Sequence, residues 1–231
     1  MKWRGLEESI PGQHAATLRE ELEERKALAA QYVPDDVQQV NRQTVEQLAA
    51  SGMSGRILAV GAAAPSFQLP DQDGKVVSSQ ELLRRGRLVI CFIRGRWCPF
   101  CVAQLEAMNR GLSYVEKAGA SLIAISPQTV KQAFFMRDQH QLRFPLLSDA
   151  GNQVARQFGL VYRVPEEQKQ VYSRTFVNLP FLNGDASWEL PIPATYILER
   201  DGRVLYASAD PDYTQRPEPQ GIVGLLDQFA A

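Results

Sequence analysis

Two cysteines with a redox-competent spacing are the most informative feature of this sequence. Cys98 and Cys101 are separated by Pro99 and Phe100, and Trp97 precedes them. Two thiols at this spacing can close a small disulfide ring and open it again by thiol–disulfide exchange. A close pair in a chain with only three cysteines is more typical of catalysis than of a secreted disulfide framework. We therefore predict that Cys98 and Cys101 form a redox-active dithiol.

A zinc site is the alternative chemistry for a Cys-x-x-Cys pair. A closed zinc site needs four ligands, and the chain offers only Cys91, His14 and His140 beyond the pair. Both histidines fall at the ends of predicted helices, and nothing in the sequence places them beside the motif. Cys91 lies inside an apolar segment and is expected to be a buried, inert thiol. The sequence therefore predicts no metal and no other cofactor.

The elements around the motif should place Cys98 at the N-terminus of a helix. Residues 88 to 93 are apolar and β-branched, which predicts a buried strand that ends just before the motif. Apolar residues then recur every three to four positions from Val102 to Val115, which predicts a helix beginning at about the motif. Pro99 suits the first turn of that helix, because the N–H it lacks would be unpaired there. Phe100 is expected to shield the second sulfur from water.

Positive potential near the motif should favour the thiolate, which is the reactive form of cysteine. The positive end of the helix dipole lies beside Cys98, and Arg94 and Arg96 stand just before it. These features predict that Cys98 is the more exposed and more acidic thiol. In that case Cys98 attacks the substrate and Cys101 resolves the bond that forms.

Composition limits the remaining function classes. The chain has 231 residues, of which 45% are hydrophobic, so it can bury a full core. Its 25 basic and 26 acidic residues leave a net charge of −1, which gives no basic excess for nucleic acid. The sequence shows neither an apolar signal core at its start nor a run of about 20 apolar residues that would span a bilayer. We expect a cytoplasmic protein that binds neither nucleic acid nor membranes.

The N-terminal part of the chain predicts a helical hairpin. Thr17 and Glu20 match a capping box, and an amphipathic pattern follows until Pro34. A second pattern then continues to the glycine-containing residues 51 to 55. We therefore divide the chain into a helical extension, residues 1–55, and a second domain, residues 56–231. A hairpin with one apolar stripe per helix can pack on its own domain or cover a second subunit, so a homodimer is left open.

From residue 57 onward strands and helices alternate, which indicates an α/β domain. We predict strands at residues 67–69, 75–77, 120–125, 144–147, 194–198 and 204–207, and helices at residues 78–83, 129–140, 152–158, 164–172 and from about 220. The stretch from Arg174 to Pro193 contains three prolines and predicts a loop. There Phe176, Phe181 and Trp188 either contact a substrate or hold the loop on the core.

Four segments together are much more specific than the cysteine pair alone. They are residues 64–70 (Ala-Pro-Ser-Phe-Gln-Leu-Pro), 94–101 (Arg-Gly-Arg-Trp-Cys-Pro-Phe-Cys), 124–127 (Ala-Ile-Ser-Pro) and 192–196 (Ile-Pro-Ala-Thr-Tyr). With these the sequence resembles the thioredoxin superfamily and, within it, the peroxiredoxin-like family of alkyl hydroperoxide reductases and thiol-specific antioxidant proteins (AhpC/TSA). The resemblance implies a thioredoxin-like fold, with a central mixed sheet flanked by helices. It also implies that Pro193 faces the dithiol, in the place where the thioredoxin fold carries a cis-proline.

The sequence departs from the usual peroxiredoxin pattern, Pro-x-x-x-Thr/Ser-x-x-Cys. When the peroxide-attacking cysteine of the family is laid on Cys101, Arg94 replaces the proline and Cys98 replaces the hydroxyl residue. The family's later arginine is not evident before Tyr196, and Arg94 or Arg96 is the only substitute that the motif offers. The resemblance thus favours Cys101 for attack on peroxide, whereas the helix terminus favours Cys98 for disulfide exchange.

Three functions follow from these features. The first is a peroxiredoxin-like thiol oxidoreductase with an antioxidant role, which reduces hydroperoxides through Cys98 and Cys101 and receives electrons from a thioredoxin- or glutaredoxin-type donor. The second is a dithiol–disulfide oxidoreductase that acts on protein disulfides. The third is a redox-responsive binding module whose hairpin, residues 17–50, meets a partner.

Overall fold

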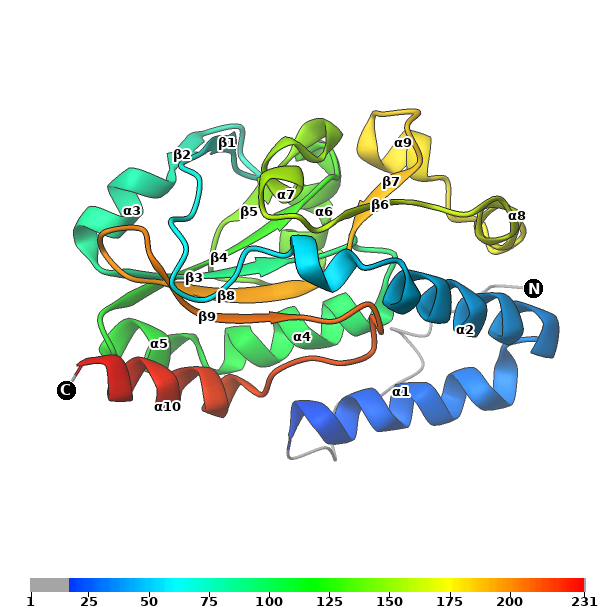
Figure 1. The fold of residues 1–231 in the computed structure, drawn as a ribbon, viewed down its shortest axis with the longest axis horizontal. Helices are drawn as coiled ribbons and strands as arrows, with labels where there is room; N and C mark the ends of the chain where they lie inside the picture. The colour runs from blue at the N-terminus through cyan, green and yellow to red at the C-terminus, as the bar shows by residue number, and fades with distance from the viewer. Residues whose placement is uncertain (1–16, 231) are drawn as a thin grey trace.

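The computed structural model describes residues 17 to 230 and shows a sheet between two layers of helices, with a helical hairpin packed beside it (Figure 1). Five strands form the central sheet in the order β5-β4-β3-β8-β9. The strands are β3 (Arg87–Phe92), β4 (Ala120–Ser126), β5 (Leu146–Ser148), β8 (Ala194–Leu198) and β9 (Val204–Ala209). β3 runs parallel to β4 and antiparallel to β8, so the sheet is mixed. This confirms the predicted strands of the central sheet.

The central strand β3 is buried on both faces, which explains its continuous apolar run. Val89 and Cys91 face a core shared with the helices α4 (Pro99–Arg110), α5 (Leu112–Lys117) and α10 (Pro219–Ala230). Leu88 and Ile90 face the opposite core, which also holds side chains of α7 (Gln153–Gln157) and of the 3₁₀ helix η1 (Met53–Arg56). Because β3 is fixed from both sides, the motif that follows it starts from a rigid position.

The helix that carries the motif begins where the sequence predicts. Cys98 is the N-cap of α4, and Pro99 occupies the first turn. The predicted helix is broken at Gly111, after which α5 continues to Lys117. The apolar spacing did not predict this break, because both helices present their apolar side chains to the same core.

The predicted hairpin is formed by α1 (Leu18–Tyr32) and α2 (Asp35–Ala50). Thr17 caps α1, and the Thr17 hydroxyl and the Glu20 carboxylate make the reciprocal bonds of a capping box. α1 packs on α4 through Leu18 and Leu22, which join the core that contains both cysteines of the motif. α2 packs on α8 (Glu166–Arg174), where the Thr44 hydroxyl lies 3.1 Å from Gln168 Oε1. The hairpin therefore covers its own domain, and the homodimer stays a prediction.

Smaller elements complete the molecule. They are β1 (Gln68–Pro70) and β2 (Val76–Ser78), which pair antiparallel, with α3 (Ser79–Arg85), α6 (Val130–Gln139), η2 (Ala150–Asn152), β6 (Val161–Arg163), α9 (Leu179–Asn183) and β7 (Glu189–Pro191). None of the helices in the described part of the chain is both long and apolar enough to span a bilayer.

The prediction of a loop from Arg174 to Pro193 is wrong in part, because α9 and β7 lie inside it. Pro180 belongs to the first turn of α9, where its missing N–H costs nothing, and Asn178 accepts a capping hydrogen bond from the N–H of Phe181 at 3.1 Å. β7 pairs antiparallel with β6, which the sequence analysis did not predict. Two strands of three residues are too short to show an alternating pattern.

Gly159 packs directly against the backbone of Arg56 in η1, so a substitution there tests this contact. It has φ +72°, and a Cβ there would lie 1.9 Å from the backbone oxygen of Arg56. Gly61 has φ +87° with open space around it, so Gly61→Ala is a matched control for the backbone strain alone. We expect Gly61→Ala to cost about 1 kcal/mol and Gly159→Ala to cost roughly 1 to 3 kcal/mol more, measured by urea unfolding. Equal losses in the two variants would contradict this packing.

Candidate functional site

The two motif cysteines lie together at the start of α4 and are closed off from solvent. Cys98 is 1% exposed and Cys101 is 0% exposed, and both are free thiols. The N–H of Cys101 donates to the Cys98 carbonyl at 3.0 Å, and the two side chains hydrogen-bond each other. The structure therefore brings together the pair that the sequence singles out. The expectation that Cys98 is exposed is wrong, because its side chain is buried in the core that also holds Phe100.

Arg94 is the main charged group beside the thiols. Its side chain is buried, and Nη2 donates to the Tyr172 hydroxyl at 2.6 Å. The guanidinium carbon lies 4.6 Å from the ring centroid of Trp97 and 4.2 Å from that of Tyr213. An aromatic cage of this kind stabilises a cation that water cannot reach. Arg94 therefore remains charged next to the sulfurs.

A second arginine reaches the site from far along the chain. Arg216 lies between β9 and α10, and its Nη2 is 3.8 Å from Cys101 Sγ. The same segment is attached to the hairpin, since Glu218 accepts hydrogen bonds from the N–H groups of Leu18 at 3.2 Å and Arg19 at 2.6 Å. Figure 1 shows this segment turning back beside the start of α4. The hairpin thus helps to hold Arg216 against the thiols.

The surroundings make the two thiols unequal. Burial works against a Cys101 thiolate, but the hydrogen bond with Cys98 and the charges of Arg216 and Arg94 outweigh it and lower the pKa of Cys101 to about 5. The backbone N–H of Arg94 also donates to the Cys101 sulfur. Burial, and then the hydrogen bond and charge of Cys101, raise the pKa of Cys98 well above its ordinary value. These directions favour Cys101 over Cys98 as the thiolate of the pair.

This result reverses the expectation that the helix terminus makes Cys98 the more acidic thiol. Among the described residues, no backbone N–H of the first turn of α4 donates a capping hydrogen bond to the Cys98 side chain. Pro99 occupies the first position of that turn and has no N–H to offer. Desolvation is the largest effect on the Cys98 pKa, and it opposes the thiolate.

The site holds more hydrogen-bond donors than acceptors. Within residues 17 to 230, no acceptor lies in reach of Arg94 Nε, Arg94 Nη1, Arg216 Nε or Trp97 Nε1, although all four atoms are buried. Unpaired buried donors are costly, and they are expected where a ligand supplies the acceptors. Peroxide oxygens, or an oxyanion that forms from them, have this property. The geometry therefore suits a small oxygen-rich substrate.

Arg96 and Pro193 are the remaining predicted neighbours of the dithiol. The backbone N–H of Arg96 donates to Gln128 Oε1 at 2.8 Å. The Arg96 side chain points its Nη1 to Gln132 Oε1, 3.5 Å away. Pro193 is buried between β7 and β8, and its peptide bond is trans, since the described chain contains no cis peptide bond. The cis-proline that the resemblance implies is therefore absent from the Ile192–Pro193 bond.

The zinc alternative gains no support from the arrangement of the described residues. They contain no group of three or more His, Cys, Asp and Glu side chains that could hold a metal ion. His140 bonds Glu106 Oε1 at 2.9 Å instead. Cys91 is fully buried in β3, and burial raises its pKa to about 12, which fits the inert thiol predicted for it. His14 lies outside the described residues.

The aromatic residues of the predicted loop divide into two groups. Trp188 is half-buried in a small core with Tyr172 and lies 5.8 Å from Lys169 Nζ, so it holds its segment on the domain. Phe176 and Phe181 are 81% and 69% exposed and therefore do not hold the loop on the core.

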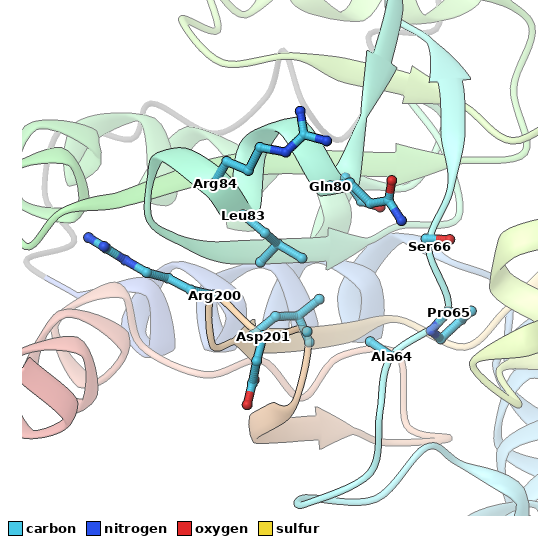
Figure 2. A pocket seen from close by; sticks show the side chains of 11 residues that line it. Ala64, Pro65, Ser66, Gln80, Leu83, Arg84, Arg200 and Asp201 are labelled. Atoms are coloured by element: carbon cyan, nitrogen blue, oxygen red, sulfur yellow. The ribbon is translucent and has the colours of Figure 1, made fainter.

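A well-formed groove elsewhere on the surface lies far from the thiols. It has a volume of about 370 Å³ and is lined by Ser66, Arg84 and Leu198, among others. Leu198 pairs with Leu88 at the start of β3, whereas Cys98 follows the other end of that strand. Figure 2 shows that the guanidinium groups of Arg84 and Arg200 point in different directions, so they do not form one anion site. We assign no chemistry to this groove.

The sequence analysis missed four residues that complete the thiol site: Tyr162, Tyr172, Tyr213 and Arg216. Tyr172 hydrogen-bonds Tyr162 and Arg94, and Tyr213 lies under Arg94. The segment around Tyr213 showed only the aspartates and prolines of a turn. A lone arginine after such a turn gives no local signal, because its role depends on the fold bringing it back to α4.

Comparisons with known proteins show which family the chain resembles. The model of the AhpC/TSA family matches residues 60–207. The chloroplastic peroxiredoxin Q of Oryza sativa subsp. japonica is 31% identical over 165 residues, which are 71% of this chain and 63% of that protein. The chain thus spans less than two thirds of that relative.

Solved structures show the same fold. The peroxidoxin BcpB of Mycobacterium tuberculosis superposes with a TM-score of 0.59 at 21% identity and covers 75% of this chain and 99% of its own. The bacterioferritin comigratory protein of Xanthomonas campestris, described for its alkyl peroxide reduction activity, superposes with a TM-score of 0.56 at 18% identity, covering 71% of this chain and 92% of its own. These structures confirm the predicted thioredoxin-like α/β fold.

The fold and the buried dithiol define a thioredoxin-like thiol protein. Because the family model matches well over half of its residues, the chain belongs to the AhpC/TSA family. The hairpin and Arg216 lie outside the residues that the family model matches.

The role of Arg216 predicts a change in the acidity of Cys101. We expect Arg216→Gln to raise the pKa of Cys101 by about one pH unit, because it removes a positive charge within about 4 Å of the sulfur. Arg96→Gln is the matched control, since Arg96 stands closer to the motif in sequence but contacts Gln128 and Gln132 instead. The ultraviolet absorbance of the thiolate, titrated on the reduced protein, measures the pKa. Equal shifts in the two variants would show that only general charge matters.

Proposed function

We propose that this protein is a thiol peroxidase that reduces hydroperoxides, with Cys101 as the attacking thiolate and Cys98 as the resolving thiol. The proposal rests on the surroundings of the Cys101 sulfur. This buried sulfur lies near the guanidinium groups of Arg94 and Arg216 and is hydrogen-bonded to Cys98. The unpaired N–H groups of Arg94 and Arg216 can receive the peroxide oxygens. Membership of the AhpC/TSA family supports the same chemistry.

The reaction balances with the groups present. The Cys101 thiolate attacks the terminal peroxide oxygen, the O–O bond breaks, and Cys101 becomes a sulfenic acid while an alkoxide or hydroxide leaves. The leaving oxygen gains stabilisation from the guanidinium N–H groups and takes up a proton, for which Cys98 is the nearest thiol. The Cys98 thiolate left by this proton transfer then attacks the sulfenic sulfur, which forms the Cys98–Cys101 disulfide and expels hydroxide, and the hydroxide takes up a proton from solvent to become water.

The cycle requires an external reductant that returns two electrons to the disulfide. A thiol donor of the thioredoxin or glutaredoxin type fits this step, because it attacks a disulfide through a thiolate. Such donors work in reducing compartments, and the cytoplasmic location stays a prediction. Reduction of protein disulfides as the main activity is less suited to this site, because a polypeptide cannot reach sulfurs that are 1% and 0% exposed without displacing the residues that cover them.

The proposal is tested by mixing the reduced protein with hydrogen peroxide and following tryptophan fluorescence in a stopped-flow instrument, since Trp97 adjoins the dithiol. We expect oxidation much faster than that of free cysteine. Cys101→Ser should abolish the fast reaction, whereas Cys98→Ser should retain it and accumulate a sulfenic acid that dimedone traps. Cys91→Ser is the control and should behave as the natural chain, because Cys91 is fully buried in β3 and its pKa of about 12 keeps it a thiol.

The same experiment has a defined pH dependence. A thiolate with a pKa of about 5 is almost fully formed at neutral pH, so the rate should rise from about pH 4 to pH 6 and then level off. A rate that keeps rising towards pH 9 would show that an ordinary thiol attacks, and would contradict the proposed role of Cys101.

A further inference from the structure

The Arg94 side chain is buried in the thiol site without a carboxylate partner. It belongs to the short connection between β3 and α4. Within residues 17 to 230 no ion pair includes Arg94. In the same part of the chain, the one hydrogen bond of its guanidinium is the bond that Nη2 donates to the Tyr172 hydroxyl at 2.6 Å. Tyr172 is therefore the group that decides which N–H groups of Arg94 remain available.

The two aromatic contacts of Arg94 do not replace this hydrogen bond. The guanidinium carbon lies 4.6 Å from the ring centroid of Trp97 and 4.2 Å from that of Tyr213. Attraction of a cation to a ring depends on its distance from the centroid, whereas a hydrogen bond requires a particular N–H direction. Because Tyr172 engages Nη2, the guanidinium nitrogens that stay unpaired among the described residues are Nε and Nη1.

Tyr172 is itself held firmly in place. Its side chain is 5% exposed, and its ring lies 5.1 Å from the ring of Trp97 at an interplanar angle of 66°. One turn earlier in α8, Gln168 hydrogen-bonds two side chains of α2, which anchors this helix on the hairpin. The Tyr172 oxygen accepts from Arg94, and its own hydrogen is left for Tyr162, to which it is also hydrogen-bonded. The hydroxyl therefore cannot turn away without breaking both bonds.

Tyr172 is not suited to act on a substrate directly. Burial raises its pKa well above the ordinary value, so it is a poor proton donor. Its effect on the reaction must therefore pass through Arg94. As a member of the small core with Leu179 and Leu190, Tyr172 would need only its ring, so removal of the hydroxyl alone separates the two roles.

We propose that Tyr172 is a positioning residue, whose hydroxyl turns the Arg94 guanidinium so that Nε and Nη1 receive the oxygen that leaves when Cys101 attacks a peroxide. In that step the S–O bond forms while the O–O bond breaks, and the attacked oxygen keeps its hydrogen as a sulfenic acid. The electron pair of the O–O bond departs with the leaving oxygen, which then takes up the proton of Cys98. This inference rests on the proposed peroxidase function. It predicts that the reaction depends on Tyr172 more strongly when the leaving oxygen is more basic.

The test compares tert-butyl hydroperoxide with peracetic acid in rapid-mixing experiments at pH 7. The first releases tert-butoxide, a strong base that needs stabilisation, and the second releases acetate, a weak base that leaves readily. We expect Tyr172→Phe to slow the reaction with tert-butyl hydroperoxide by about tenfold, because Arg94 loses its orientation. The rate with peracetic acid should fall by no more than about twofold.

Tyr196→Phe is the matched control. It also removes a buried tyrosine hydroxyl, but one for which the described residues offer no hydrogen-bond partner. Tyr196 belongs to the core on the opposite face of the sheet from the dithiol. We expect this variant to leave the ratio of the two rates unchanged.

The outcomes separate this inference from the proposed function. If the natural chain reduces neither peroxide, the peroxidase function fails. If it reduces both, and Tyr172→Phe slows both equally or neither, the positioning role is overturned. Tyr162→Phe is the second variant should Tyr172→Phe fail to fold. It removes the acceptor of the Tyr172 hydrogen, and a loss of about threefold, confined to tert-butyl hydroperoxide, is expected from it.

A double-mutant cycle with Arg94→Gln shows whether the hydroxyl acts through the guanidinium. Arg94→Gln alone should slow the reaction with tert-butyl hydroperoxide at least as much as Tyr172→Phe does. Tyr172→Phe added to Arg94→Gln should then change the ratio of the two rates no further. If Tyr172→Phe lowers that ratio equally with and without Arg94, the hydroxyl acts independently of the guanidinium and the proposal is wrong.

Discussion

The structure depends on one interaction, the sharing of a proton between two buried sulfurs that face fixed positive charge. A buried thiolate is unfavourable unless hydrogen bonds and cations compensate for the lost water. Here Cys98 provides the hydrogen bond, and Arg94 and Arg216 provide the charge. Two neighbouring arginines would repel each other if unscreened. The rings of Trp97 and Tyr213 stabilise Arg94, and a Cys101 thiolate would attract both guanidinium groups.

Two segments outside the residues that match the family model support this interaction, namely the hairpin and the stretch between β9 and α10. Arg216 and Tyr213 come from the segment between β9 and α10, and Glu218 attaches that segment to the first turn of α1. The hairpin in turn packs on α4, the helix that begins with the dithiol. Removal of the hairpin would therefore loosen the position of Arg216. In this chain the extension is part of the site and not a separate module.

Much of the fold could be predicted because its local signals agree with its packing. The apolar run of β3, the capping box at Thr17 and the proline after Cys98 each mark an element at the place where the structure has it. The candidate site was predictable only as far as the motif reaches. Arg216 and Tyr172 come to the thiols through long-range contacts, which no spacing in the sequence encodes. The order of acidity expected from the helix terminus differs from the one that the surroundings of the two thiols favour, because burial and the positions of Arg94 and Arg216 depend on the complete fold.

The most direct test of the central claim is the ¹³C NMR titration of the reduced protein with labelled cysteine Cβ atoms, assigned with the single Cys→Ser variants. This measurement reports each sulfur in place and needs no reagent to reach a buried site. The account predicts that the Cys101 signal titrates near pH 5 while Cys98 remains a thiol through neutral pH. If Cys98 loses its proton first, the assignment of the attacking thiolate to Cys101 is wrong.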